Sequence, residues 1–141
     1  MSLLREKSGF TLIDIAVVLT MLGVALAMTV PMSRRVIARY ELNSAAQTLS
    51  SDLAHAKIRA IQSNSITVLR RETLREYRVA GHPRQLPDMV RFDDASVDSL
   101  RFDGLGATLD GGLHLLLLEN RFGDRVEVRV YSSGGHEVRR L

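Results

Sequence analysis

Residues 10–32 form an apolar run in which Asp14 is the single ionisable side chain. At about 1.5 Å of rise per residue, a helix of this length spans roughly 35 Å, which is enough to cross a hydrocarbon core of about 30 Å. Basic residues stand on both sides of the run, so charge does not decide the orientation of such a helix. The run therefore predicts a membrane-spanning helix that carries one acid.

A second helical pattern follows the run. Pro31 lacks a backbone N–H, so we expect a kink in the helix between about residues 27 and 31. Beyond it, apolar residues recur at spacings of three and four, which predicts an amphipathic helix over about residues 33–64. These residues are Leu42, Ala45, Ala46, Leu49, Leu53, Ala56 and Ala60. No glycine separates Pro31 from Gly81, so the two segments are expected to form one long, bent helix.

After Asn64 the apolar period changes from 3.6 to 2, which predicts short strands over about residues 65–141. The clearest hairpin joins residues 113–118 to the alternating segment 125–131, and a last short strand follows at 137–141. Glycine and proline at 81–83 and proline at 87 predict loops. The expected fold class is therefore α+β: a long, bent N-terminal helix, half membrane-spanning and half amphipathic, packed on a small antiparallel β-sheet.

Charge is unevenly distributed along the residues after the apolar run. Residues 34–91 carry eleven basic and five acidic side chains, whereas residues 92–137 carry nine acidic and four basic ones. The simpler interpretation is a solvated surface with clustered charges. The alternative is complementary contact between identical or related subunits.

The residues give no indication of catalysis. The chain has no cysteine, and its four histidines are scattered without the spacing of a metal site or of an activated nucleophile. They are His55, His82, His114 and His136. Gly104-Leu105-Gly106 lacks the third glycine of a dinucleotide-binding loop. We expect no enzyme activity, no cofactor and no metal.

The start of the apolar run, Gly9-Phe10-Thr11-Leu12-Ile13-Asp14, resembles the prepilin signature of type IV pilins and type II secretion pseudopilins. The resemblance implies that a prepilin peptidase cleaves between Gly9 and Phe10 and methylates the new amine of Phe10. Residues 1–9 would then be a leader peptide, residues 10–32 the transmembrane and filament-core half of the helix, and residues 33–141 a periplasmic globular domain. Pro31 stands where pilins commonly have a proline.

Later segments resemble the GspH/FimT branch of this family, the minor pseudopilins and minor pilins. They are residues 41–68, residues 102–107, and residues 134–139 after the predicted hairpin. The resemblance implies a pilin-like fold and a structural subunit of a type II secretion pseudopilus or type IV pilus. Its partners would be other pilins or pseudopilins, the prepilin peptidase and the inner-membrane assembly platform. Its location would be the bacterial inner membrane, single-pass with a periplasmic C-terminal domain, and then a periplasmic or surface filament.

Asp14 stands where the family usually has glutamate. A charged group at the centre of a bilayer costs about 2.5–3.5 kcal/mol on insertion scales, so such an acid normally has a partner or a function. The resemblance implies that Asp14 pairs with the Phe10 amine of a neighbouring subunit and sets the register of assembly, while apolar packing supplies most of the attraction. The alternative is an acid that interacts with the helix dipole and reaches the membrane interface.

Two other functions stay open. Some minor pilins of this branch take up DNA through a basic C-terminal motif, and Arg139 and Arg140 could contact phosphates. However, Glu137 interrupts that group, and aromatic residues for base stacking make up only 5% of the chain, so nucleic acid is not favoured as a partner. The third function is a signal-anchored periplasmic protein unrelated to filaments, which would keep residues 1–9. The filament subunit is the favoured hypothesis.

Overall fold

The computed structural model describes residues 11–141, except the side chains of residues 28–32. A single long helix, α1 (Leu12–Ser63), is followed in these residues by eight strands. The strands are β1 (Thr67–Arg71), β2 (Glu76–Val79), β3 (His82–Gln85), β4 (Val90–Phe92), β5 (Ser99–Phe102), β6 (His114–Asn120), β7 (Arg125–Val130) and β8 (His136–Arg140). The chain divides between Arg35 and Val36 into two compact units.

Between Leu12 and Leu26, α1 carries large apolar side chains that are exposed to solvent. Its large hydrophobic side chains between Leu12 and Leu26 are 48–86% exposed. A helix that is apolar all round normally lies in a membrane or inside a protein. Within the described residues, no helix combines the length and the apolar character needed to cross a membrane. The predicted span also includes Phe10 and the side chains of residues 28–32, which lie outside the described residues.

In the second unit, the predicted apolar stripe of α1 is buried. All seven of its members, from Leu42 to Ala60, are at most 4% exposed. Four of them are alanines, and all seven belong to one buried cluster with side chains of the strands. The helix ends where Asn64 adopts a left-handed conformation with φ of 44°, and the N–H of Ser65 donates to the carbonyl of Ala60.

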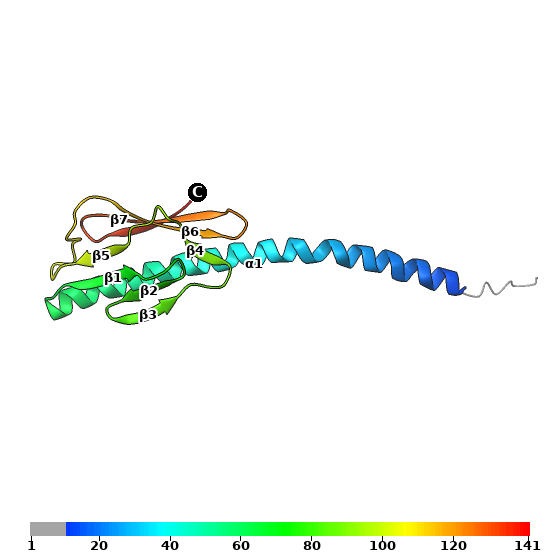
Figure 1. Ribbon diagram of the computed structural model, residues 1–141, viewed down its shortest axis with the longest axis horizontal. Helices are drawn as coiled ribbons and strands as arrows, with labels where there is room; N and C mark the ends of the chain where they lie inside the picture. The colour runs from blue at the N-terminus through cyan, green and yellow to red at the C-terminus, as the bar shows by residue number, and fades with distance from the viewer. Residues whose placement is uncertain (1–10) are drawn as a thin grey trace, which may run out of the picture. The chain divides into compact units, whose positions relative to one another are not determined.

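The strands form two antiparallel sheets beside the C-terminal half of α1 (Figure 1). One has the order β3-β2-β1-β5 and the other β4-β6-β7-β8. Both inner faces supply large buried side chains to the same core, among them Leu69 and Phe102 from the first sheet and Phe92 and Leu116 from the second. The expected antiparallel arrangement is confirmed, and the strands are divided between two sheets.

One local prediction was wrong. Residues 81–83 were expected to form a loop, whereas β3 begins at His82 and includes Pro83. The chain reverses between β2 and β3 in a two-residue turn at Ala80 and Gly81, which both have positive φ, of 50° and 86°. Pro83 is tolerated because β3 is an edge strand, where a missing N–H removes no ladder hydrogen bond.

Two glycine loops pack on each other and on α1. A Cβ atom at Gly134 would lie 1.9 Å from the carbonyl oxygen of Gly106, and a Cβ at Gly106 would lie 2.8 Å from Cδ1 of Ile61. Lys57 Nζ donates to the carbonyl of Ser133 at 3.1 Å and ties the second loop to the helix. The glycines are therefore required by contact as well as by their positive φ.

We predict that Gly134→Ala destabilises the protein more than the matched variant Gly123→Ala. Both glycines have positive φ, of 71° and 83°, which costs an alanine about 1–2 kcal/mol. A Cβ at Gly123 meets open space, whereas one at Gly134 meets backbone and adds about 1–3 kcal/mol of overpacking. Urea unfolding of the detergent-solubilised chain measures both losses. Equal losses would show that the two loops are not in contact.

Candidate functional site

Asp14 closes a reciprocal cap at the start of α1. Its Oδ2 atom accepts hydrogen bonds from the backbone N–H of Thr11 at 3.1 Å and from the Thr11 hydroxyl at 2.9 Å. The backbone N–H of Asp14 in turn lies 3.4 Å from the Thr11 hydroxyl. This is the arrangement of a capping box, with aspartate at the position usually held by glutamate or glutamine. The contact is local to the start of the helix, and the role of Asp14 in assembly stays a prediction.

The other predicted residues of the N-terminal region are less fully described. Gly9 and Phe10, the predicted cleavage and methylation positions, lie outside the described residues. Pro31 lies within α1, and its side chain is among those not described. The kink expected at Pro31 stays a prediction.

The structure does not bring Arg139 and Arg140 together. They are consecutive residues of β8, so their side chains point to opposite faces of the sheet. Arg140 lies opposite Val126 and lines a cavity of about 240 Å³ together with Arg39 and Asp124. Arg139 lies opposite Glu127 on the outer face. The two guanidinium groups therefore do not form one continuous phosphate-binding surface.

Basic and acidic blocks of the sequence pair within the chain. Arg39 Nη2 lies 3.1 Å from Asp124 Oδ1, and the guanidinium of Arg91 donates to Glu119 at 2.7 Å. Asp98 also forms an ion pair with Arg71. These pairs explain part of the charge separation along the sequence without any second subunit.

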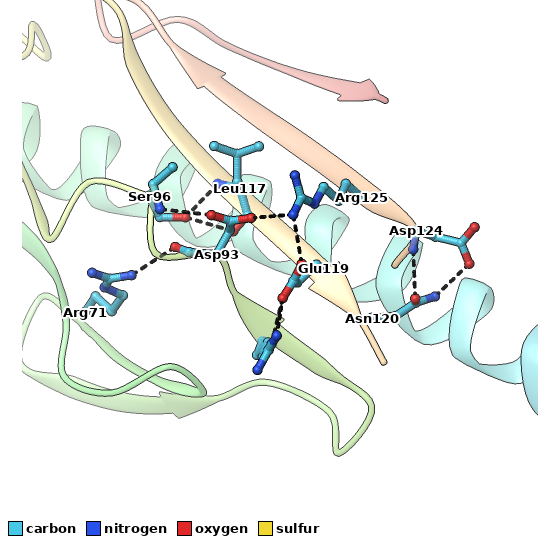
Figure 2. A network of polar contacts seen from close by, with 10 residues as sticks. Arg71, Asp93, Ser96, Leu117, Glu119, Asn120, Asp124 and Arg125 are labelled. Carbon is cyan, nitrogen blue, oxygen red and sulfur yellow. Dashed lines mark hydrogen bonds and ion pairs between the residues drawn. The ribbon is translucent and has the colours of Figure 1, made fainter. Parts of the chain in front are cut away.

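A polar network joins the loop after β4 to the second sheet (Figure 2). Arg125 lies between two carboxylates, 3.3 Å from Asp93 Oδ2 and 3.4 Å from Glu119 Oε2. The hydroxyl of Ser96 both donates to the carbonyl of Leu117 and accepts from its N–H, each at 2.8 Å. Arg71 of β1 donates to the carbonyl of Asp93 at 3.1 Å. The network therefore connects the two sheets beside their shared core.

Sequence reasoning missed a buried polar cluster between α1 and the first sheet. Asp52 is 5% exposed, accepts a 2.7 Å hydrogen bond from the Tyr77 hydroxyl, and lies 3.4 Å from Arg84. The sequence did carry a signal, because Asp52 follows Leu49 by three residues and so falls on the core side of the helix. Within the described residues, no three histidine, aspartate or glutamate side chains are grouped so that they could hold a metal ion.

We predict that Tyr77→Phe lowers the free energy of unfolding at pH 7 by about 1.5–3 kcal/mol, because it removes a hydrogen bond to a buried carboxylate. Burial, and then the adjacent Asp52, raise the pKa of Tyr77 above its ordinary value of 10.0. Stability from this tyrosine is thus present below pH 10 and lost as the pH rises above it, so the parent chain should lose more stability there than the variant.

Tyr131→Phe is the matched control for this prediction. Tyr131 also donates to a carboxylate, Glu137, at 2.9 Å, but it is exposed, so we expect a smaller loss at pH 7. Urea unfolding at pH 7 and pH 11 provides the measurement. The same loss from both substitutions would contradict a special role for the buried Asp52 cluster.

The helix and its two sheets make the pilin-like fold, in which a long N-terminal helix packs on antiparallel strands. Two crystal structures of the type IV minor pilin FimU from Pseudomonas aeruginosa strain PAO1 share this fold. The first, in space group P21, has a TM-score of 0.62 and 13% sequence identity, over 72% of this chain and 90% of the FimU chain. The second, in space group P65, has a TM-score of 0.58 and 13% identity, over 70% and 92% of the two chains.

At this identity the likeness concerns the fold alone. No protein-family model matches the chain, and no curated protein sequence matches it.

Proposed function

We propose that this chain is a minor pilin or pseudopilin, a structural subunit that enters a type IV pilus or a type II secretion pseudopilus through its N-terminal helix. The observation that carries the proposal is the apolar half of α1. Its side chains from Leu12 to Leu26 are exposed all round, while the domain from Val36 onward has a complete core of its own. Such a helix requires a membrane or other subunits to cover it. The fold shared with FimU supports filament subunits as the cover.

The same proposal assigns roles to the residues before the helix. A prepilin peptidase removes residues 1–9 by cutting between Gly9 and Phe10, and the new amine of Phe10 is methylated. Residues 10–32 hold the subunit in the inner membrane, with the globular domain in the periplasm, until the assembly platform inserts it into a filament. Pro31 kinks the helix between these two parts.

Asp14 contributes the charged contact of assembly. Both hydrogen bonds from Thr11 go to Oδ2, which leaves Oδ1 as an acceptor for the Phe10 amine of the adjacent subunit. The cap and the intersubunit pair are therefore compatible. The cap also fixes the carboxylate, so less conformational entropy is lost when the pair forms.

We predict that Asp14→Ala is inserted and processed but enters filaments at least about tenfold less than the parent chain, because the amine of the neighbour is left without a counter-charge. Thr11→Ala is the matched control, since it disturbs the cap and keeps the carboxylate. It should lose less incorporation than Asp14→Ala, because the charge remains and only the fixing of the carboxylate is weakened. Quantitative immunoblotting of sheared filaments against the membrane fraction measures incorporation.

Three results are informative. Equal losses from both substitutions would mean that Asp14 acts only through the helix cap. Normal incorporation of Asp14→Ala would show that the acid is dispensable. If the Asp14→Glu chain enters filaments well and the Asp14→Asn chain enters them poorly, the result would agree with a charged contact.

A further inference from the structure

The two sheets have four edge strands, and three of them are protected. On β3, the N–H of Leu86 donates to the carbonyl of Arg75 in the direction of β2. Backbone groups point alternately toward and away from the neighbouring strand, so position 83 points away from β2. Pro83 stands at this position and has no N–H to offer. On β4, the outward N–H groups of Val90 and Phe92 donate to the carbonyls of Pro87 and Leu74. These two edges therefore offer few free donors.

The third protected edge is that of β5. Residues 107–109 run beside it: the N–H of Asp103 donates to the Ala107 carbonyl, and the N–H of Leu109 donates to the Arg101 carbonyl. Phe102 and Thr108 form a bridge between these bonds. Proline and covering segments are two of the means that prevent association at a sheet edge, beside short strands and charged side chains.

The fourth edge, β8, has neither device. Its bonds to β7 include Tyr131 N–H to the Gly135 carbonyl and Leu141 N–H to the Arg125 carbonyl. Because hydrogen-bonded pairs alternate along an antiparallel ladder, the backbone N–H and C=O groups of the odd-numbered residues of β8 point toward β7. The N–H and C=O groups of His136, Val138 and Arg140 therefore point outward. Within residues 11–141, no backbone or side-chain group pairs with them.

The two residues next to Val138 in β8 are opposite in charge. Val138 is 40% exposed and lies on the inner face, opposite the buried Val128. Its two neighbours on the outer face, Glu137 and Arg139, are exposed and opposite in charge. Glu137 is held in place through Oε2, which accepts from the hydroxyl of Tyr131 at 2.9 Å. An acid and a base flanking a central valine make the strand complementary to itself in the antiparallel direction.

We propose that β8 is a self-association edge, which pairs antiparallel with β8 of a second copy of this chain about a two-fold axis at Val138. In this register Val138 faces its own counterpart, and Glu137 of each copy faces Arg139 of the other. In this register the hydrogen bonds between the two copies use the outward backbone groups of His136, Val138 and Arg140. The same register places each Glu137 opposite an Arg139, so backbone hydrogen bonding and side-chain charge favour the same pairing. The two four-stranded sheets become one continuous sheet of the dimer.

The partner is a second copy because the complementarity is between the strand and itself. The contact is small, so the affinity is that of a transient interface. The inference does not rest on the proposed function, since β8 belongs entirely to the domain from Val36 onward.

Cysteine cross-linking tests the contact, because the chain has no cysteine. Hydrogen-bonded antiparallel pairs have Cα atoms about 5.5 Å apart, which is within the range of a disulfide. Val138→Cys in the full chain, purified in detergent and oxidised with a copper catalyst, should form a covalent dimer at least about tenfold faster than Val68→Cys. Val68 is a matched control, since it is 37% exposed on the outer face of β1. Equal rates would overturn the proposal.

Charge reversal tests the register. In the Val138→Cys background, Glu137→Arg or Arg139→Glu alone places like charges opposite each other and should slow cross-linking toward the rate of the control. The double variant restores two opposite-charge pairs and should recover the parent rate. Failure of the double variant to recover, or no effect of either single reversal, would contradict the Val138-centred pairing. Cross-linking in cells only to a different subunit would also overturn it.

Discussion

The domain depends on one contact, the packing of the apolar stripe of α1 against the inner faces of both sheets. The stripe consists of three leucines and four alanines, and the strands contribute larger side chains to the same cluster, so that helix and sheets share a single core. Tyr77 and Phe92 join the two sheets across this core, with ring centroids 5.7 Å apart and planes at 88°. Each sheet alone has only four strands and one covered face. Neither would have a dry core without the helix.

The other half of α1 has the opposite property, since its apolar side chains are exposed on every side. The C-terminal half of α1 therefore stabilises the globular domain, whereas the exposed N-terminal half adds nothing to that core. The globular domain is complete from Val36 onward, and the exposed apolar segment is available to a membrane or to other subunits. The capping box of Thr11 and Asp14 shows that the helix has a defined start, even though the acid stands in an apolar sequence.

The local parts of the fold could be predicted from the sequence. Helical spacing identified the stripe, and the change of period after Asn64 identified the strands. The division into two sheets could not be predicted, because it depends on long-range pairing: β1 pairs with β5, and β4 pairs with β6, with no local pattern that specifies either. Asp52 was overlooked because Leu49 and Leu53 already satisfied the helical spacing.

For the candidate site, the sequence pointed to Asp14 but not to its contact. The spacing of Thr11 and Asp14 is that of a capping box and could have been read as one. Adjacent arginines at 139 and 140 looked like one basic group, yet alternation along a strand separates their side chains. The open edge of β8 was not visible in the sequence, since an edge exists only once the neighbouring strands are placed.

Processing and assembly as a pilin subunit, which we propose for this chain, would leave a defined mark on its N-terminus. Intact-mass and peptide mass spectrometry of the chain extracted from membranes and from sheared filaments would identify the first residue. We expect an N-methylated Phe10 as the first residue in both fractions. A chain that keeps residues 1–9 in a cell with an active prepilin peptidase would contradict it.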